Sequence, residues 1–164
     1  ILFNHESPRR GETFVTQKIV QAMCKIKKNQ QKILYLGNIY AKRDWGHAKD
    51  YVEAMWLMLK QKKPQDFVIA TGKQYTVKSF IDNVAKKLDM KIFWKGKGNN
   101  EKAVDDKGRI IVACSKTYYR PLEVNSLLGD ARKARKLLKW SPKINLDRLI
   151  EDMIEVEMDK ISYL

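Results

Sequence analysis

The sequence is poor in the residues that build disulfide scaffolds, metal sites and phosphate-binding loops. Its 164 residues include two cysteines, two histidines and eight glycines. Two cysteines cannot form a disulfide framework, and so few thiols favour a reducing compartment, so we expect a cytoplasmic protein. The glycines are dispersed, which argues against a Gly-rich phosphate loop. No group of His, Cys and Asp has the spacing of metal ligands, so we expect no metal site.

Long apolar runs are also missing. No stretch approaches the roughly 20 apolar residues that a membrane-spanning helix needs. The first four residues lack the basic start and long apolar stretch of a signal peptide. We therefore expect no contact with a membrane. Residues 1–3 have the pattern of a buried strand, and the sequence does not begin with Met. We expect a C-terminal piece of a longer protein.

Positive charge is in clear excess. The sequence holds 33 Lys and Arg against 19 Asp and Glu, a net charge of +14. Such a surplus attracts nucleic acid, acidic lipid or phosphorylated small molecules. The excess is mostly scattered Lys, which is typical of solvated helix faces, whereas surfaces that grip phosphate are more often rich in Arg. A basic nucleic-acid-binding module is therefore the less favoured alternative, and the sequence contains no nucleic-acid-binding signature.

The apolar pattern alternates between strand and helix, so the predicted class is α/β. Four consecutive apolar residues at 67–70 are typical of a strand buried on both faces, as in a parallel sheet. Thr13, Thr76 and Asp130 are expected to cap helices. The expected strands are 1–3, 33–36, 67–70, 91–94 and 109–113; the expected helices are 14–26, 48–62, 77–88, 127–138 and 146–158; loops are expected at 39–47 and 95–108.

No complete catalytic group is visible in the residues. Cys24 falls on the apolar stripe of the first helix, where a core position is a better interpretation than a nucleophile. No serine lies in a Gly-x-Ser-x-Gly turn. We therefore expect no catalytic residue in this chain.

Three loops instead carry Arg beside other polar groups, at 4–11, 37–47 and 118–124. In open α/β sheets, ligands bind beyond the carboxyl ends of the strands, where the first loop is expected. Arg43 and Arg120 are suited to clamp a diphosphate through charge-assisted hydrogen bonds, and Glu123 is suited to accept from a hydroxyl. Both arginines also have a structural alternative. Arg43 can form a local ion pair with Asp44, and Arg120 with Pro121 can end a strand. Taken together, the loops favour a phosphorylated small ligand.

Several longer motifs resemble one known family, the GDP-mannose 4,6-dehydratases, which belong to the extended short-chain dehydrogenase/reductases. The likeness covers essentially the whole chain, in order. Its most specific motifs are eight and sixteen residues long. The motifs are NHESPRRG at 4–11, FVTQKI at 14–19, LGN at 36–38, AKRDWGHAKDYVEAMW at 41–56, DFVIATG at 66–72, YYRPLEV at 118–124 and WSP at 140–142.

The resemblance implies a fold and a division into domains. It implies that this chain is the C-terminal part of an extended short-chain dehydrogenase/reductase, with an N-terminal Rossmann half absent. Residues 1–3 and about 43–71 would be pieces of the NADP-binding Rossmann domain, namely late strands of its sheet and one helix. Residues from about 4 to 42 and 72 to 164 would form a smaller mixed α/β substrate domain for the sugar nucleotide.

The resemblance also implies a reaction. The family converts GDP-mannose and releases water to give GDP-4-keto-6-deoxymannose, the precursor of GDP-fucose, with NADP as the cofactor. Its catalytic Thr-x-Glu and Tyr-x-x-x-Lys motifs do not occur in this sequence. The resemblance therefore implies a lyase as the full-length protein and an inactive fragment. Family members are usually homodimers or homotetramers.

Individual site residues follow from the same motifs. The NADP contacts of the family fall on His5 and Arg10, where an Arg can neutralise a ribose 2′-phosphate. Gln17 stands where many relatives carry Arg, and the resemblance implies a weaker neighbouring subunit or cofactor contact there. The substrate contacts fall on Asn4, Val15, Lys18, Leu36, Gly37, Arg43, Arg120 and Glu123.

A related sugar-nucleotide reductase or epimerase is the alternative within the enzyme class. Such relatives share an Asn in the first loop and the Arg-Asp pair, but they seldom share HESPRRG at 5–11.

Overall fold

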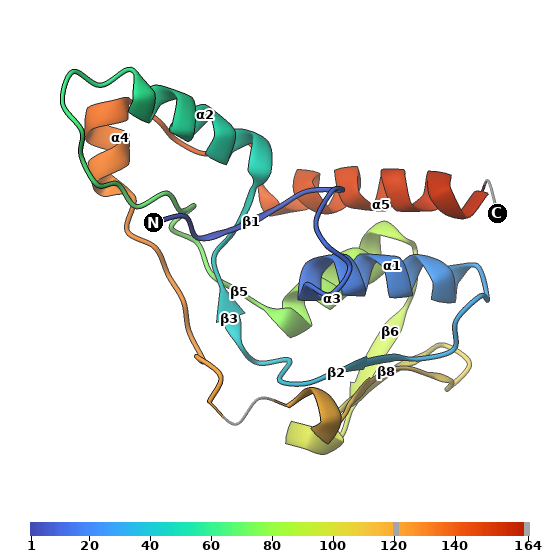
Figure 1. Cartoon of the computed structure of the whole chain (residues 1–164). Coiled ribbons are helices and arrows are strands. Elements are labelled where there is room, and N and C mark those ends of the chain that lie inside the picture. Colours follow the sequence, from blue (N-terminus) through green and yellow to red (C-terminus); the bar gives the residue numbers. More distant parts are fainter. Residues whose placement is uncertain (120–121, 163–164) are drawn as a thin grey trace.

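The computed structural model describes residues 1–119 and 122–162, and within them the chain is an α/β protein (Figure 1). Short strands alternate with five α-helices, as the apolar pattern predicts. The elements are β1 (Asn4–Glu6), α1 (Val15–Lys27), β2 (Leu34–Leu36), β3 (Lys42–Arg43), β4 (Trp45–His47), α2 (Ala48–Leu59), β5 (Tyr75–Thr76), α3 (Val77–Lys87), β6 (Ile92–Lys95), β7 (Lys102–Asp105), β8 (Ile110–Cys114), α4 (Arg132–Leu138) and α5 (Leu146–Ser162), with short 3₁₀ turns at Gly98–Asn100 and Lys116–Tyr118.

The strands form one four-stranded sheet and two small two-stranded sheets. The larger sheet has the order β2-β8-β7-β6, in which β2 runs parallel to β8 and the other neighbours are antiparallel. β1 runs parallel to β4, and β3 runs antiparallel to β5. Leu2 also forms a parallel bridge with Ile69. The two segments predicted to belong to the Rossmann domain, residues 1–3 and about 43–71, therefore lie side by side at this point. The division into domains itself stays a prediction.

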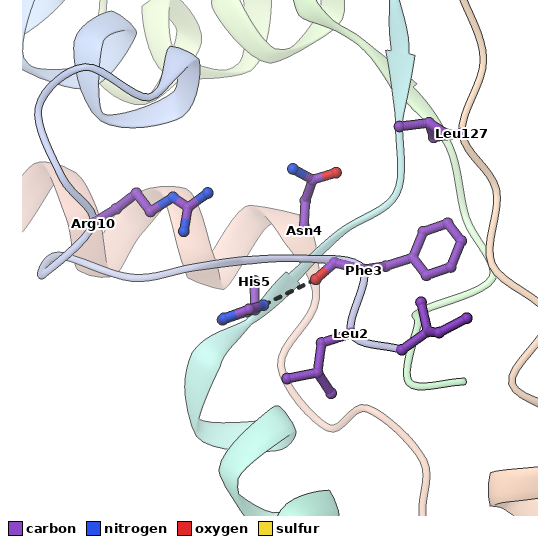
Figure 2. Close-up of a pocket in the computed structure, with 7 residues that line it drawn as sticks. Leu2, Phe3, Asn4, His5, Arg10 and Leu127 are labelled. Atoms are coloured by element: carbon purple, nitrogen blue, oxygen red, sulfur yellow. Dashed lines mark hydrogen bonds between the residues drawn. The ribbon is translucent and has the colours of Figure 1, made fainter. Parts of the chain in front are cut away.

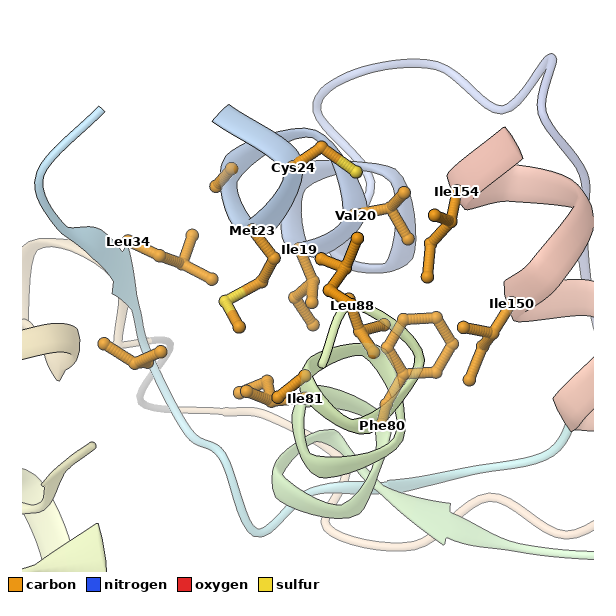
Figure 3. Packing of buried hydrophobic residues seen from close by; sticks show 14 of the residues in the cluster. Ile19, Val20, Met23, Cys24, Leu34, Phe80, Ile81, Leu88, Ile150 and Ile154 are labelled. Carbon is orange, nitrogen blue, oxygen red and sulfur yellow. The ribbon is translucent and has the colours of Figure 1, made fainter. Parts of the chain in front are cut away.

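The larger hydrophobic core lies between α1, α3, α5 and the four-stranded sheet (Figure 3). Apolar side chains recur every three or four residues on these helices, so each helix turns one stripe inward. Phe80 of α3 is fully buried where α1 and α5 meet α3. Cys24 is fully buried in the same core, and its burial raises the pKa of the thiol to about 12. The prediction of a core cysteine is therefore confirmed.

A second, smaller core joins α2 and α4 to residues 67–70 (Figure 1). Tyr51 and Ala54 of α2 face this core, and Ala134 and Leu138 of α4 face it from the other side. Gly129 lets the chain pass very close to Ala70, because a Cβ at this position would lie 2.1 Å from the Ala70 Cβ. The packing therefore groups α4 with residues predicted to belong to the Rossmann domain.

Part of the apolar surface of α2 stays uncovered. Val52, Met55, Trp56 and Leu59 follow helical spacing on one face, and Trp56 and Leu59 are 58% and 81% exposed. We call these four residues the α2 outer face. Within the described residues, no helix combines the length and apolar character needed to cross a bilayer.

The secondary-structure predictions were wrong for two strands, in two loops and at two caps. In place of the predicted strands 1–3 and 67–70, the structure has only the isolated bridge between Leu2 and Ile69. The predicted loop 39–47 contains β3 and β4, and the predicted loop 95–108 contains β7. β3 and β4 form because distant partners, β5 and β1, supply their hydrogen bonds, which local composition does not reveal. β7 instead pairs with its sequence neighbours β6 and β8.

The N-cap of α1 is Phe14 rather than Thr13, and no side chain caps this end. The N-cap of α4 is Ala131 rather than Asp130, and no side chain caps this end either. Thr76 does cap α3 by accepting from the backbone N–H of Ser79 at 3.0 Å.

Candidate functional site

One cavity brings together almost all the residues predicted to bind substrate. It has a volume of about 510 Å³ and is lined by parts of β1, α1, β2, β3 and α3, and by Tyr118 and Glu123. We call it the main cavity. Arg120, the remaining predicted substrate residue, lies outside the described residues. The predicted substrate residues in its lining are Asn4, Val15, Lys18, Leu36, Gly37, Arg43 and Glu123.

Glycine is required at position 37 by a close backbone contact. A Cβ at this position would lie 2.1 Å from the carbonyl oxygen of Tyr118. The neighbouring contact is a hydrogen bond in which the Ser115 N–H donates to the Leu36 carbonyl at 2.7 Å. The end of β2 is thus held against residues 115–118, and together they form one wall of the main cavity.

Arg43 and Glu123 meet each other at the rim of the main cavity. The Arg43 Nη2 lies 2.9 Å from the Glu123 Oε1, and the Arg43 Nη1 donates to the Val124 carbonyl at 2.7 Å. This ion pair links residues that are 80 positions apart in sequence. The local ion pair with Asp44, which was the structural alternative for Arg43, is not what the structure shows: Arg43 pairs with the distant Glu123 instead. Its role in binding a diphosphate stays a prediction.

Asp44 has a separate structural role. Its carboxylate is fully buried and accepts from the Thr71 N–H and hydroxyl at 2.9 and 2.6 Å. It also accepts from the Gly72 N–H at 2.9 Å and from the Gly129 N–H at 3.3 Å. The Asp44 carboxylate therefore joins its own segment, directly beside Arg43, to residues 71–72 and to Gly129.

Lys18 presents a second cation to the main cavity. Its Nζ lies 3.6 Å from the centroid of the Tyr118 ring, which is a cation–π contact. Burial lowers the pKa of the Lys18 ammonium from its ordinary value. The start of α1 adds to the positive potential, since Phe14 and Val15 line the cavity and no side chain caps this helix end. This wall is electrostatically suited to an anion.

A second cavity of about 310 Å³ lies beside the first and contains both predicted NADP residues (Figure 2). His5 and Arg10 line it together with residues 1–4 and Leu127. Asn4 lines both cavities. Figure 2 shows Asn4 and His5 pointing to opposite sides of the strand, as alternate residues of a strand do. One strand, β1, thus serves two adjacent cavities.

His5 and Arg10 are held by specific neighbours. The His5 ring stacks on Tyr51 with a centroid distance of 5.1 Å, and its Nδ1 lies 2.9 Å from the Phe3 carbonyl. As the Nδ1 proton satisfies this carbonyl, the Nε2 is the ring atom that remains for a ligand. The Arg10 guanidinium lies over the Phe14 ring at 3.5 Å, and its Nε is 3.1 Å from the Glu6 Oε2.

Glu6 anchors this arrangement from a buried position. The Thr16 hydroxyl donates to its carboxylate at 2.5 Å. Burial raises the pKa of the Glu6 carboxyl, while the Thr16 hydrogen bond and the Arg10 charge oppose this rise. The guanidinium of Arg10 is therefore fixed by a carboxylate and an aromatic face before any ligand is bound.

Sequence reasoning missed Tyr118 as a residue of the main cavity. The aromatic pair before Arg120 was visible in the motif, but contact with Lys18 depends on residues 100 positions apart meeting in space. Glu6 was also missed, although it lies within the first Arg-bearing loop. Among the described residues, no group of three His, Cys, Asp or Glu side chains is arranged to hold a metal ion.

Comparison with solved structures finds chains of the same fold. RMD from Pseudomonas aeruginosa, solved with NADPH, superposes with a TM-score of 0.78 at 16% identity over 97% of this chain and 47% of that chain. A dTDP-glucose 4,6-dehydratase from Bacillus anthracis, solved with NAD, superposes with a TM-score of 0.72 at 15% identity over 99% of this chain and 44% of that chain. At these identities the likeness shows the fold alone: this chain has the fold of a little under half of each of these structures.

Sequence comparison is more specific. The family described as GDP-mannose 4,6 dehydratase matches residues 1–153. A GDP-mannose 4,6 dehydratase from Dictyostelium discoideum is 51% identical over 99% of this chain and 46% of its own length. The human GDP-mannose 4,6 dehydratase is 48% identical over 97% of this chain and 43% of its own length. The chain thus spans a little under half the length of these relatives, and with this agreement along its whole length it belongs to the GDP-mannose 4,6-dehydratase family.

Proposed function

We propose that this chain is the sugar-nucleotide-binding part of an NADP-dependent GDP-mannose 4,6-dehydratase. The observation that carries the proposal is the convergence of the predicted substrate residues on the main cavity, beside a second cavity that contains the predicted NADP residues. In the proposed reaction, GDP-mannose loses water and becomes GDP-4-keto-6-deoxymannose. The full-length protein would be a lyase that serves the synthesis of GDP-fucose and other deoxyhexoses.

The charges of the main cavity suit a diphosphate. Lys18 and Arg43 provide two cations, and the uncapped start of α1 adds backbone N–H groups. Arg43 donates in a planar fork that matches phosphate oxygens, while Lys18 acts as a compact point charge. Asn4 stands between the two cavities, where its amide is placed to hold the sugar near the cofactor. Arg120 would add a second guanidinium.

The second cavity suits the nucleotide end of NADP. A guanidinium fixed in the wall of a cavity can pair with the 2′-phosphate that distinguishes NADP from NAD, which is the role we assign to Arg10. His5 offers its Nε2 to the same ligand. Held there by Arg10 and His5, NADP would supply reversible hydride chemistry and would be regenerated in each turnover. The family's Thr-x-Glu and Tyr-x-x-x-Lys motifs do not occur here, so we place proton transfer outside this chain.

The proposal is tested with the full-length protein that contains this chain. With NADP present, it should convert GDP-mannose to a 4-keto product. Arg43→Ala removes a charge-assisted contact of about 1.5–3 kcal/mol, so KM should rise about 10- to 150-fold. Arg109→Ala serves as the control, because Arg109 is an exposed residue outside the main cavity. A folded protein that does not turn over GDP-mannose would refute the proposal.

A reductase or epimerase is the second candidate. It is favoured by the solved neighbours, which include a UDP-glucose 4-epimerase from Thermotoga maritima at a TM-score of 0.70. The product separates the candidates: an epimerase keeps oxygen at C6, and a reductase consumes NADPH. Nucleic-acid binding is the least favoured candidate, and it requires a steep fall of affinity with salt. We further propose a cytoplasmic homodimer or homotetramer, which sedimentation of the full-length protein tests.

A further inference from the structure

Tyr118 lines the main cavity, and the proposed function assigns it no role. Its ring lies under the Lys18 ammonium at 3.6 Å, and its side chain lines the cavity. We infer that Tyr118 is a specificity-determining residue, which positions Lys18 to recognise the diphosphate of the ligand. This inference rests on the proposed function and adds to it a residue and a basis for selecting charged ligands.

The two cations of the main cavity differ in what neutralises them. Arg43 is paired with Glu123, so part of its charge is already compensated. Within the described ranges, Lys18 has no carboxylate partner. An aromatic face attracts an ammonium through its quadrupole but adds no negative charge. Tyr118 therefore holds Lys18 in place and leaves its positive charge and N–H donors available to a ligand.

The backbone that carries the Tyr118 ring is held independently of Lys18. The Tyr118 backbone packs directly against Gly37, and its N–H donates to the Ser115 carbonyl at 3.1 Å. Ser115 in turn donates to the Leu36 carbonyl at the end of β2. Tyr118 is thus connected through Ser115 to the end of β2, whereas Lys18 contacts its ring from α1. A cation held in its binding position before the ligand arrives loses less entropy on binding.

The consequence is a preference that depends on ligand charge. Loss of the ring should weaken the binding of GDP, which carries the diphosphate, and should hardly change the binding of guanosine, which has no phosphate. A purely structural role for Tyr118 would weaken both ligands alike. The ratio of the two dissociation constants therefore separates the inference from a loss of folding or of cavity shape.

The experiment measures Kd for GDP and guanosine by calorimetry with the full-length protein. Tyr118→Leu should weaken GDP binding about 2- to 30-fold, the range expected for one cation–π contact. Tyr118→Phe keeps the ring and should restore most of the affinity. Tyr35→Leu is the matched control, because Tyr35 is a half-exposed tyrosine of β2 that does not line the main cavity.

A double-mutant cycle with Lys18→Met makes the test specific to this pair. In that background, Tyr118→Leu should cause no further loss of GDP affinity. The inference is overturned if the two losses simply add, or if GDP and guanosine weaken equally. Tyr118→Met gives a second ring-free variant if Tyr118→Leu does not fold.

The same cycle also separates this inference from the proposed function. If the wild-type protein prefers UDP to GDP, the cycle is measured with UDP and uridine, and coupling there supports the role of Tyr118 while refuting the assignment to GDP-mannose. If the wild-type protein binds no nucleoside diphosphate, both are refuted.

Discussion

The two hydrophobic cores of this chain differ in how completely they are closed. The larger core is enclosed by α1, α3, α5 and the four-stranded sheet, and its central side chains are fully buried. The smaller core has α2 and α4 on residues 67–70, and the α2 outer face remains exposed. The main cavity borders the larger core, since Leu36 and Val77 belong to both and Val15 packs against that core. The binding residues are thus supported by the better-closed part of the molecule.

The largest expected effect comes from deleting an aromatic ring in the larger core. Phe80→Ala should lower the free energy of unfolding by about 3–5 kcal/mol, because the emptied volume is surrounded on all sides. Phe67→Ala in the smaller core should cost less, about 1–3 kcal/mol, since one side of that ring is covered by the Lys133 side chain. Chemical denaturation of both variants measures the difference. Equal losses would show that the cores are equally closed.

A smaller effect is expected where the smaller core is most tightly packed. Gly129→Ala places a Cβ in contact with Ala70 and the Phe3 ring, so it should destabilise the fold by about 1–3 kcal/mol. Gly11→Ala is the control, because its Cβ would meet only the exposed Phe14 ring at 3.3 Å. Denaturation midpoints of the two variants test this. A neutral Gly129→Ala would mean that residues 67–70 and 129 move apart at little cost.

The smallest effect on stability, but a visible one on association, is expected at the α2 outer face. Leu59→Glu should change the free energy of unfolding by no more than about 0.5 kcal/mol, as exposed substitutions usually do. It should nevertheless reduce self-association of the isolated chain, because contiguous exposed apolar residues promote it. Sedimentation velocity measures this. Leu122→Glu is the control, since Leu122 is 97% exposed but lies apart from the α2 outer face.

The sequence predicted the larger core better than the small sheets. Apolar spacing alone located α1, α3 and α5, because a helix carries its own hydrogen bonds and needs only one buried stripe. β3 and β7 could not be found in this way. Lys42-Arg43 is polar, and its hydrogen bonds come from Tyr75 and Thr76, which lie more than 30 positions further along the chain. Strands of this kind exist only because their partners are already in place.

The candidate site shows the same difference between what local sequence predicts and what depends on the tertiary fold. Motif resemblance selected residues that the fold then placed around one cavity, although their individual roles stay predictions. Resemblance gave no information on how those residues contact one another. The Arg43–Glu123 ion pair and the Lys18–Tyr118 contact each join segments at least 80 positions apart. Such contacts depend on the tertiary fold and could not be read from local patterns.

Asp44 gives the site a mechanical property of its own. Its carboxylate binds the backbone at Thr71, Gly72 and Gly129, while the side chain of the preceding residue, Arg43, lines the main cavity. A displacement of residues 69–72 must therefore carry the guanidinium with it. A movement at the edge of the smaller core would thus change the position of the Arg43 guanidinium in the main cavity.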